Sequence, residues 1–367
     1  MKQNYFMLAA AAMMFAACSQ SDLVDEIQES APQAIEFSTF ANKTTRAVEN
    51  NDSAAYSSAL EGHHTTFNVW ASKKLASGSY IDVYADTVPG KVSYSSQWTA
   101  TPLKFWDKTA ESYAFYAAAP ADLAWVATNT AGANGTLSLA NFLLTGVNNT
   151  ASESWKDSAD IDLMIADTCT TYKGDYSTVD LNFIHILSRL NIKVKSSYND
   201  ADSDPLNDPV IMLTGLNVCG LKNKGTFNEA TAAVPAGTTD RWANLTEYGT
   251  YTLAAKLPST QLTSTPVLTH KYLIIPQAQK NVSASANVAT APSGEAYIQI
   301  QYTVDGEPYE TYYSLAQAFG IAQNSYLNFK EGWQNTLTID IDPNVISFTG
   351  KVATWGTDAV AGDVTIN

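Results

Sequence analysis

Residues 296–306 read Ala-Tyr-Ile-Gln-Ile-Gln-Tyr-Thr-Val-Asp-Gly, and this stretch decides the fold class of the chain. Apolar and polar side chains alternate up to Val304, and a second extended run follows at residues 308–314. Asp-Gly between two such runs is a strong signal for a two-residue turn between antiparallel strands. The stretch therefore predicts a β-hairpin.

The same alternation recurs on both sides of this hairpin. Further strands are predicted at residues 66–71, 80–85, 91–95, 112–118, 160–166, 210–218 and 271–276. Gly, Pro, Asn and Ser separate these short runs, a spacing typical of β-sandwiches. Residues 179–194 alternate at both ends around an irregular middle, which predicts a strand, a short helical or bulged turn and a second strand. Residues 129–158 carry little charge and are rich in Ala, Asn, Gly and Thr, which predicts a long loop.

Composition narrows the class of protein further. The chain has 367 residues, of which 45% are hydrophobic and 16% are charged, so it can bury large cores and carries few of the charges typical of exposed helices. Its 36 acidic residues outnumber 21 basic ones, giving a formal charge of −15. A surface of that sign repels phosphate backbones, so we expect no nucleic-acid partner.

The N-terminus has the pattern of an export signal. Lys2 precedes an apolar run from Tyr5 to Ala17 that is too short to span a bilayer, so residues 1–17 are predicted to be a signal peptide. Cys18 directly follows small residues, and this junction looks like a relaxed bacterial lipobox whose thiol carries a lipid. Ordinary secretory cleavage, with Cys18 incidental, is the alternative. Residues 18–34 are polar and acidic, which indicates a tether.

Two further segments stand out, one near each end of the chain. Ile35 and Phe37 alternate with polar residues, which predicts a strand buried on one face. Polar, turn-rich sequence surrounds Arg46 and Ala47, which predicts an accessible loop; the alternative is that Arg46 is one surface arginine among several. Near the C-terminus, apolar residues and glycines keep one parity at positions 346, 348, 350 and 352, and again at 360, 362, 364 and 366.

Motifs that carry catalytic or metal chemistry are missing from the sequence. None of the four histidines has a Cys, Asp or second His at zinc-site spacing, and no phosphate-binding loop or nucleophile elbow occurs. We therefore expect no metal site, no cofactor, no catalytic residue and no enzymatic activity. Cys169 and Cys219 fall in different predicted domains and are expected to be two separate buried thiols, the alternative being a disulfide formed in an oxidising envelope. His185 is expected to be a packing residue in an apolar segment.

Several short pieces of the sequence, taken in order, resemble the fimbrillin family, the type V pilins of Bacteroidales and their Mfa-like relatives. The matching pieces are the lipobox at Cys18, Ile35-Glu36-Phe37, Thr44-Thr45-Arg46-Ala47, Phe67-Asn68-Val69-Trp70, Tyr113 to Ala117, Asp162 to Ala166, Leu181 to His185, Leu273 to Gln277 and Trp355. They extend over nearly the whole chain.

This resemblance implies an all-β fold of two tandem transthyretin-like Greek-key sandwiches, at residues 47–176 and 177–367. It also implies an outer-membrane lipoprotein precursor that an arginine-specific protease cuts between Arg46 and Ala47. The cut removes residues 35–46, with Ile35 and Phe37, and the C-terminal strand of a neighbouring subunit takes their place. The expected donor residues are Ile346, Phe348, Val352, Val360, Val364 and Ile366.

The resemblance predicts a structural subunit, a stalk or tip pilin, in a surface fimbrium. Its partners would be other fimbrial subunits, the protease, the lipid anchor of the precursor, and a ligand on a host or bacterial surface. The alternative is a surface glycan-binding lipoprotein of a polysaccharide-uptake system, for which aromatic side chains gathered on one exposed face would be evidence. Trp70, Trp98, Trp106 and Trp355 lie in or beside strand patterns, so we expect them in the core.

Overall fold

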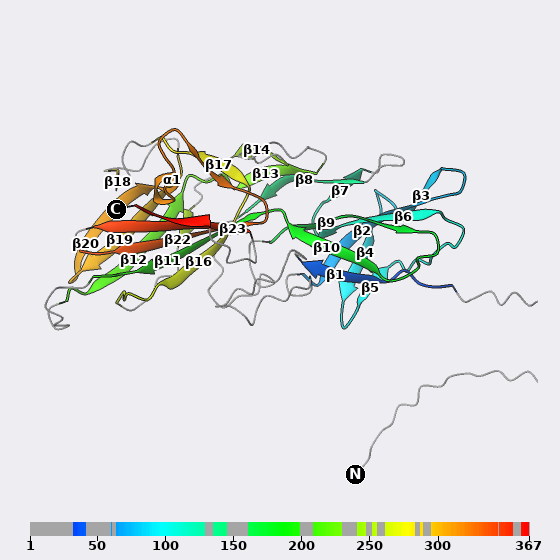
Figure 1. Cartoon of the computed structure of the whole chain (residues 1–367), viewed down its shortest axis with the longest axis horizontal. Helices are drawn as coiled ribbons and strands as arrows, with labels where there is room; N and C mark the ends of the chain where they lie inside the picture. The colour runs from blue at the N-terminus through cyan, green and yellow to red at the C-terminus, as the bar shows by residue number, and fades with distance from the viewer. Residues whose placement is uncertain are drawn as a thin grey trace, which may run out of the picture. The chain divides into compact units, whose positions relative to one another are not determined.

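The computed structural model describes residues 32–41, 60, 64–128, 135–144, 161–198, 208–229, 241–246, 252–254, 261–282, 287–288, 295–343, 345–354 and 361–366. Within these residues the fold is nearly all β, with one short helix, α1 (Leu315–Ala318). The predicted all-β class is confirmed (Figure 1). No helix among the described residues is long and apolar enough to cross a membrane.

The first sheet closes on itself. It contains β1 (Phe37–Ala41), β2 (Thr66–Lys74), β3 (Tyr80–Tyr84), β4 (Gly90–Tyr94), β5 (Trp98–Thr101), β6 (Ser112–Ala119), β9 (Met164–Tyr172) and β10 (Val179–His185). The strand order is β3-β2-β4-β5-β1-β10-β9-β6, and an additional β2–β6 pairing joins the two ends into a ring that excludes β3. One hydrophobic cluster, with Phe67, Phe115 and Phe183, takes residues from every strand of this ring.

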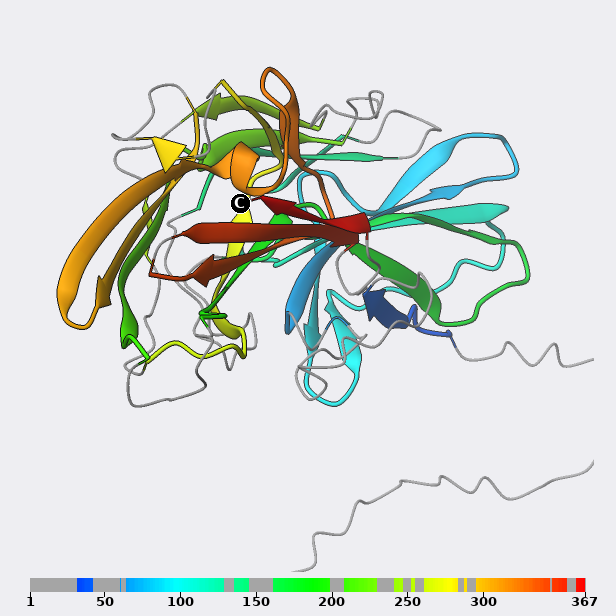
Figure 2. The same cartoon turned by 60° about the vertical axis from the view of Figure 1, so that its left-hand side comes forward.

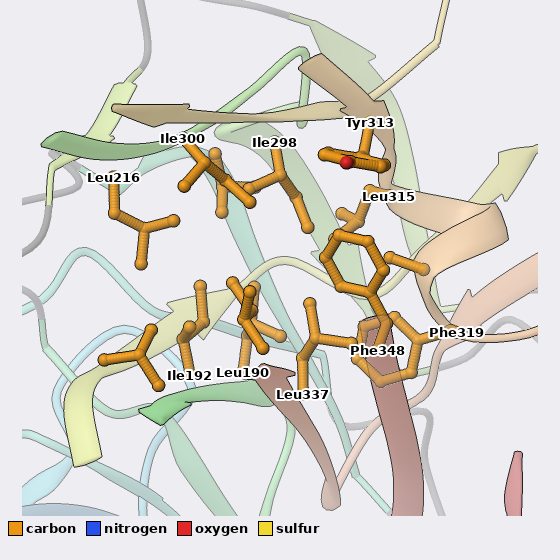
Figure 3. Packing of buried hydrophobic residues seen from close by; sticks show 14 of the residues in the cluster. Leu190, Ile192, Leu216, Ile298, Ile300, Tyr313, Leu315, Phe319, Leu337 and Phe348 are labelled. Atoms are coloured by element: carbon orange, nitrogen blue, oxygen red, sulfur yellow. The ribbon is translucent and has the colours of Figure 1, made fainter. Parts of the chain in front are cut away.

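The C-terminal part contains two sheets with a shared core. One runs β16 (Val267–Ile274), β11 (Ser188–Lys195), β22 (Trp333–Ile341), β23 (Ile346–Thr354), β24 (Ala361–Ile366). The other runs β15 (Thr252–Ala254), β12 (Ile211–Cys219), β19 (Tyr297–Val304), β20 (Glu307–Ser314), β18 (Asn287–Val288). Figure 3 shows Leu190, Ile192 and Leu337 from the sheet of β11 and β22 opposite Leu216, Ile298 and Ile300 from the sheet of β12 and β19. The packing is that of a β-sandwich.

The remaining strands form two small sheets. A four-stranded sheet, β14 (Trp242–Thr246), β13 (Lys224–Asn228), β8 (Thr136–Leu143), β7 (Val126–Thr128), joins segments far apart in the chain. Its Phe142, Phe227 and Trp242 share a buried cluster with Trp70 and Ile165 of the ring strands. β17 (Gln277–Lys280) pairs with β21 (Tyr326–Phe329).

The predicted hairpin is confirmed. β19 and β20 pair antiparallel from Val304↔Glu307 to Tyr297↔Ser314, so Asp305 and Gly306 form the turn. Both turn residues have positive φ, 51° and 86°, as a two-residue turn that matches strand twist requires. The prediction for residues 179–194 is also confirmed, because β10 and β11 are separated only by Ile186 and Leu187.

One prediction of local structure is wrong. Residues 129–158 were expected to form a loop, yet β8 lies within them and pairs with β7 and β13. The rest of that stretch, residues 129–134 and 145–158, lies outside the described residues. Leu137, Leu139 and Phe142 are buried there against strands from elsewhere in the chain. Low charge and small residues therefore reflected a buried strand.

Sheet membership changes after His185. β10 still pairs with β1 and β9 of the ring, whereas β11 begins the C-terminal sandwich. The domain boundary predicted from the sequence, after residue 176, lies ahead of β10 in the polar stretch of residues 172–178. The division into two tandem domains stays a prediction.

Candidate functional site

The candidate site is the place of residues 33–41 in the ring, called the β1 site below. β1 lies between β10 and β5 (Figure 1). It pairs in parallel with β10 from Phe37↔Val179 to Ala41↔Phe183, but with β5 only at Phe37↔Trp98. β1 is thus held mainly along one edge.

Residues before β1 add hydrogen bonds on the other side. The Ile35 amide donates to the Lys104 carbonyl at 2.9 Å, and the Trp106 amide donates to the Gln33 carbonyl at 2.9 Å. On the β10 side, the Val179 amide donates to the Glu36 carbonyl at 2.8 Å. The segment is therefore bonded on both sides, as an inserted strand must be to satisfy its backbone.

Side chains of the segment alternate between core and surface. Ile35 is 2% exposed and Phe37 5% exposed, with Thr39 also buried, whereas Glu36 is exposed. The Phe37 ring meets the Phe67 ring at 6.2 Å and the Phe115 ring at 6.0 Å, both edge to face. Such pairs add specific geometry to apolar burial. The alternation expected from the sequence is observed.

Polar contacts complete the attachment at the surface. Ser38 Oγ donates to the Asp180 carboxylate, and Gln33 Nε2 donates to the Tyr176 carbonyl at 2.7 Å. Exposed hydrogen bonds of this kind contribute little net stability, so burial of Ile35 and Phe37 dominates the attachment.

Loss of residues 33–41 would open the ring. β5 and β10 would each be left with one unpaired edge. The apolar cluster that contains Phe67 and Phe115 would no longer be covered by residues 33–41. Exposed strand edges and apolar surface are a template for a replacement strand. The chain connects β1 to buried Leu60 only through residues 42–59. Arg46 and Ala47 fall in that connection, and both lie outside the described residues. Cys18, near the N-terminus, also lies outside them.

The expected donor residues fall on two C-terminal strands. Ile346 and Phe348 on β23 are buried in the sandwich core, and Val352 is half-buried. The Phe348 ring contacts the Tyr313 ring at 4.7 Å (Figure 3). β23 is paired on both sides, with β22 and β24, so it is an integral strand of its own sheet.

β24 is the edge strand of that sheet. Among the described strands it pairs with β23 alone, with Val364 opposite Gly350 and Ile366 opposite Phe348. Figure 2 shows this C-terminal strand in dark red beside β23. Val360 lies outside the described residues. Detaching β24 would leave β22, β23 and the core strands paired.

Comparison with known proteins gives the family. A model of the fimbrillin-like family matches residues 45–355, most of the chain. The chain belongs to the fimbrillin-like family. Family membership supports a role as a fimbrial subunit or adhesin at the cell surface. The match begins after β1 and ends before β24.

Solved structures resemble this fimbrillin-like chain at low identity. A fimbrial protein from Bacteroides vulgatus is 18% identical, with 88% of this chain and 99% of that chain covered and a TM-score of 0.49. A candidate cell adhesion protein from Bacteroides ovatus is 13% identical, with 89% and 98% covered and a TM-score of 0.49. A fimbrial assembly protein from Parabacteroides distasonis is 11% identical, with 88% and 98% covered and a TM-score of 0.33. No curated protein sequence matches the chain.

Outside the β1 site, one histidine of this fimbrillin-like chain pairs with a buried carboxylate, and two cysteines are partly covered. His185 and Asp162 are both buried, with Nδ1 of the histidine 2.8 Å from the carboxylate. Sequence spacing gave no sign of this pair, because the two residues meet only through β9–β10 packing. Cys169 and Cys219 are both half-buried, and burial raises the pKa of the Cys169 thiol.

Proposed function

We propose that this chain is a structural subunit, a stalk or tip pilin, of a surface fimbrium that assembles by strand exchange. The precursor is a lipoprotein of the outer membrane, anchored through Cys18. An arginine-specific protease cuts after Arg46, residues 33–41 leave the β1 site, and the C-terminal strand of a neighbouring subunit replaces them.

One observation carries the proposal. Residues 33–41 supply Ile35 and Phe37 to the core of the ring, yet they reach the rest of the chain only through residues 42–59, which contain Arg46. While that connection is intact, β1 is held at a high effective concentration. After cleavage it is a separate fragment held by non-covalent contacts, and a competing strand can displace it.

The C-terminal end supports the donor half of the exchange. Because β24 pairs on one side only, its release breaks one strand pairing and leaves the sandwich core assembled. Ile346 and Phe348 are needed in their own core, so we place the proposed donor at β24, with Val364 and Ile366, and at Val360 just before it. A donor at one end and an acceptor at another form a heterologous contact that does not close, which yields filaments.

For the glycan-binding alternative, the expected evidence was aromatic side chains gathered on one exposed face. Among the described residues Tyr80, Phe105, Tyr172, Tyr309 and Tyr326 are exposed, and whether they gather on one face is untested, so glycan binding stays the alternative. The tryptophans give it no support. Trp70, Trp98, Trp106, Trp125 and Trp242 are buried, and Trp333 is half-buried. The expectation that Trp70, Trp98 and Trp106 lie in the core is confirmed, while Trp355 lies outside the described residues.

The proposal is tested on purified precursor treated with an arginine-specific protease. We expect a new N-terminus at Ala47, followed by ladders of polymers on gels run without boiling. The Arg46→Ala precursor should stay monomeric under the same treatment. Polymerisation of that variant at the parental rate, or a parent cut at Arg46 that stays monomeric, would refute the mechanism.

A matched control uses Lys43, which also lies between β1 and the rest of the chain. Treating the Arg46→Ala precursor with a lysine-specific protease severs the connection at Lys43 and should restore the ladders. This arm shows that the variant is folded and competent, and that the cut itself, rather than the arginine side chain, is what matters.

A further inference from the structure

Two large apolar side chains lie exposed directly beside the β1 site. Leu103 is 49% exposed and Phe105 is 48% exposed, on the stretch of chain between β5 and β6. The backbone of this stretch accepts a hydrogen bond from the Ile35 amide and donates one to the Gln33 carbonyl, so it forms one wall of the site. Leu103 and Phe105 are called the wall pair below.

The wall is anchored independently of β1. Trp106 is buried, and its ring meets the Tyr113 ring at 4.8 Å and the Phe115 ring at 5.9 Å, both edge to face. Successive side chains of an extended stretch point to opposite faces, so the burial of Trp106 turns Phe105 outward. Departure of β1 would leave these anchoring contacts in place and the wall pair exposed.

The strand that leaves the site covers the wall pair poorly. Ala34 lies opposite Phe105 in an antiparallel bridge. The hydrogen bonds of Ile35 and Gln33 flank this bridge, which makes it a non-hydrogen-bonded pair, the kind that brings facing side chains closest. Alanine has only a methyl group to place against the ring. Phe105 therefore keeps about half of its surface in solvent although the site is filled.

The rest of the outer surface at the site is polar. Glu36 on the β1 segment is exposed, and so are Asp180 and Asn182 on β10. Exposed apolar surface with a polar rim is typical of contacts between proteins. The wall pair thus differs from its surroundings in the way that a docking surface does.

A strand that replaces residues 33–41 has to pass the wall pair. It satisfies the carbonyl of Lys104 and the amide of Trp106 only by running along the wall as residues 33–35 do. The molecule that supplies this strand is thereby brought against Leu103 and Phe105. Position therefore favours the incoming subunit as the partner that covers the pair.

We infer that Leu103 and Phe105 form a second contact between subunits, covered by the neighbouring copy of this chain whose strand enters the β1 site. This inference rests on the proposed strand exchange and adds a docking surface outside the space of β1. Removal of two half-exposed apolar side chains from water favours the polymer over the precursor, in which Ala34 leaves them open.

Serine at both wall positions tests the inference in full-length precursor cut at Arg46. The Leu103→Ser, Phe105→Ser variant is compared with an Ile81→Ser, Val88→Ser variant. Ile81 on β3 and Val88 just after it are also exposed apolar residues, and β3 lies outside the closed ring. Sedimentation gives the midpoint, which is the protein concentration at which half of the cleaved chain is in polymers.

We expect the wall variant to raise this midpoint at least about tenfold, because covering half of a leucine and half of a phenylalanine side chain changes affinity by that much. The control variant should match the parent. Below the midpoint, fluorescent peptide 33–41 should bind the cleaved wall variant within about fivefold of the cleaved parent, because Ala34 offers Phe105 only one small cross-strand contact.

A second measurement uses the chain without substitutions. Hydroxyl-radical labelling should modify Phe105 in the precursor and spare it in polymers, while Ile81 reacts equally in both. Equal labelling of Phe105 in both states, or a wall variant with the parental midpoint, would overturn the inference and leave strand exchange intact.

Peptide binding separates a docking role from a role within the β1 site. A loss of peptide 33–41 binding as large as the loss of polymer would overturn the inference, because the wall pair would then act only by holding the inserted strand. If the cleaved parent itself forms no polymer, the proposed strand exchange fails and the inference with it.

Discussion

Truncation of Phe37 gives the sharpest test of the role of β1 in the precursor. Phe37 is 5% exposed and makes edge-to-face contacts with Phe67 and Phe115 in the ring core. Phe→Ala at such a site costs about 3–5 kcal/mol, because the lost transfer free energy is joined by a cavity that packed neighbours fill only partly. That is a large share of the stability of a typical domain.

The measurement is urea unfolding of intact precursor, followed by tryptophan fluorescence, since Trp98 and Trp106 share the same cluster. We expect the Phe37→Ala midpoint to fall with little change in slope. Glu36→Ala is the matched control, because Glu36 is exposed on the same segment and should change stability by less than about 0.5 kcal/mol.

Cleavage at Arg46 adds a second check on the same variant. Parent and Phe37→Ala precursors yield the same chain, residues 47–367, once the N-terminal fragment has been removed. Their unfolding curves should then coincide. A loss below about 1 kcal/mol in the precursor would refute the packing argument, and a difference that persists after removal of the fragment would show that the substitution acts elsewhere.

Two further predictions concern acid stability and the donor strand. Hydrogen bonds from Lys73 and Thr109 lower the pKa of Asp107 from 3.8 to about 2. Because the unfolded chain binds this proton more readily than the folded protein, Asp107 contributes fully to the free energy of unfolding above about pH 4, and its contribution is lost as the pH falls toward 2. The thermal midpoint of the Asp107→Asn variant should therefore vary less with pH over that range than the midpoint of the parent. Identical pH profiles for the two proteins would contradict this role of Asp107. Deleting residues 358–367 should leave a folded subunit that accepts a strand but donates none, so filaments of normal length, seen by electron microscopy, would exclude β24 as the donor.

Local features of the fold were predictable from neighbouring residues. The turn at Asp305-Gly306 and the one-sided burial of Ile35 and Phe37 follow from period-two alternation, which is a property of adjacent positions. The strand at 136–143 was missed although Leu137 and Leu139 alternate with Thr136 and Ser138, because this short run lies in Gly-, Asn- and Ala-rich sequence and its partner Lys224–Asn228 is far along the chain. The His185–Asp162 pair was missed because the two residues meet only in the folded chain.

The sequence by itself determined the all-β class and the resemblance to fimbrillins, because each follows from short runs of consecutive residues; the export signal stays a prediction. Only the tertiary structure decided that β1 completes a ring and that β23 is an inner strand while β24 is an edge strand. Pairing of Phe37 with both Val179 and Trp98 depends on strands brought together by folding. Which strand can leave a sheet is set by its neighbours in space, and alternation looks the same in an inner and an edge strand.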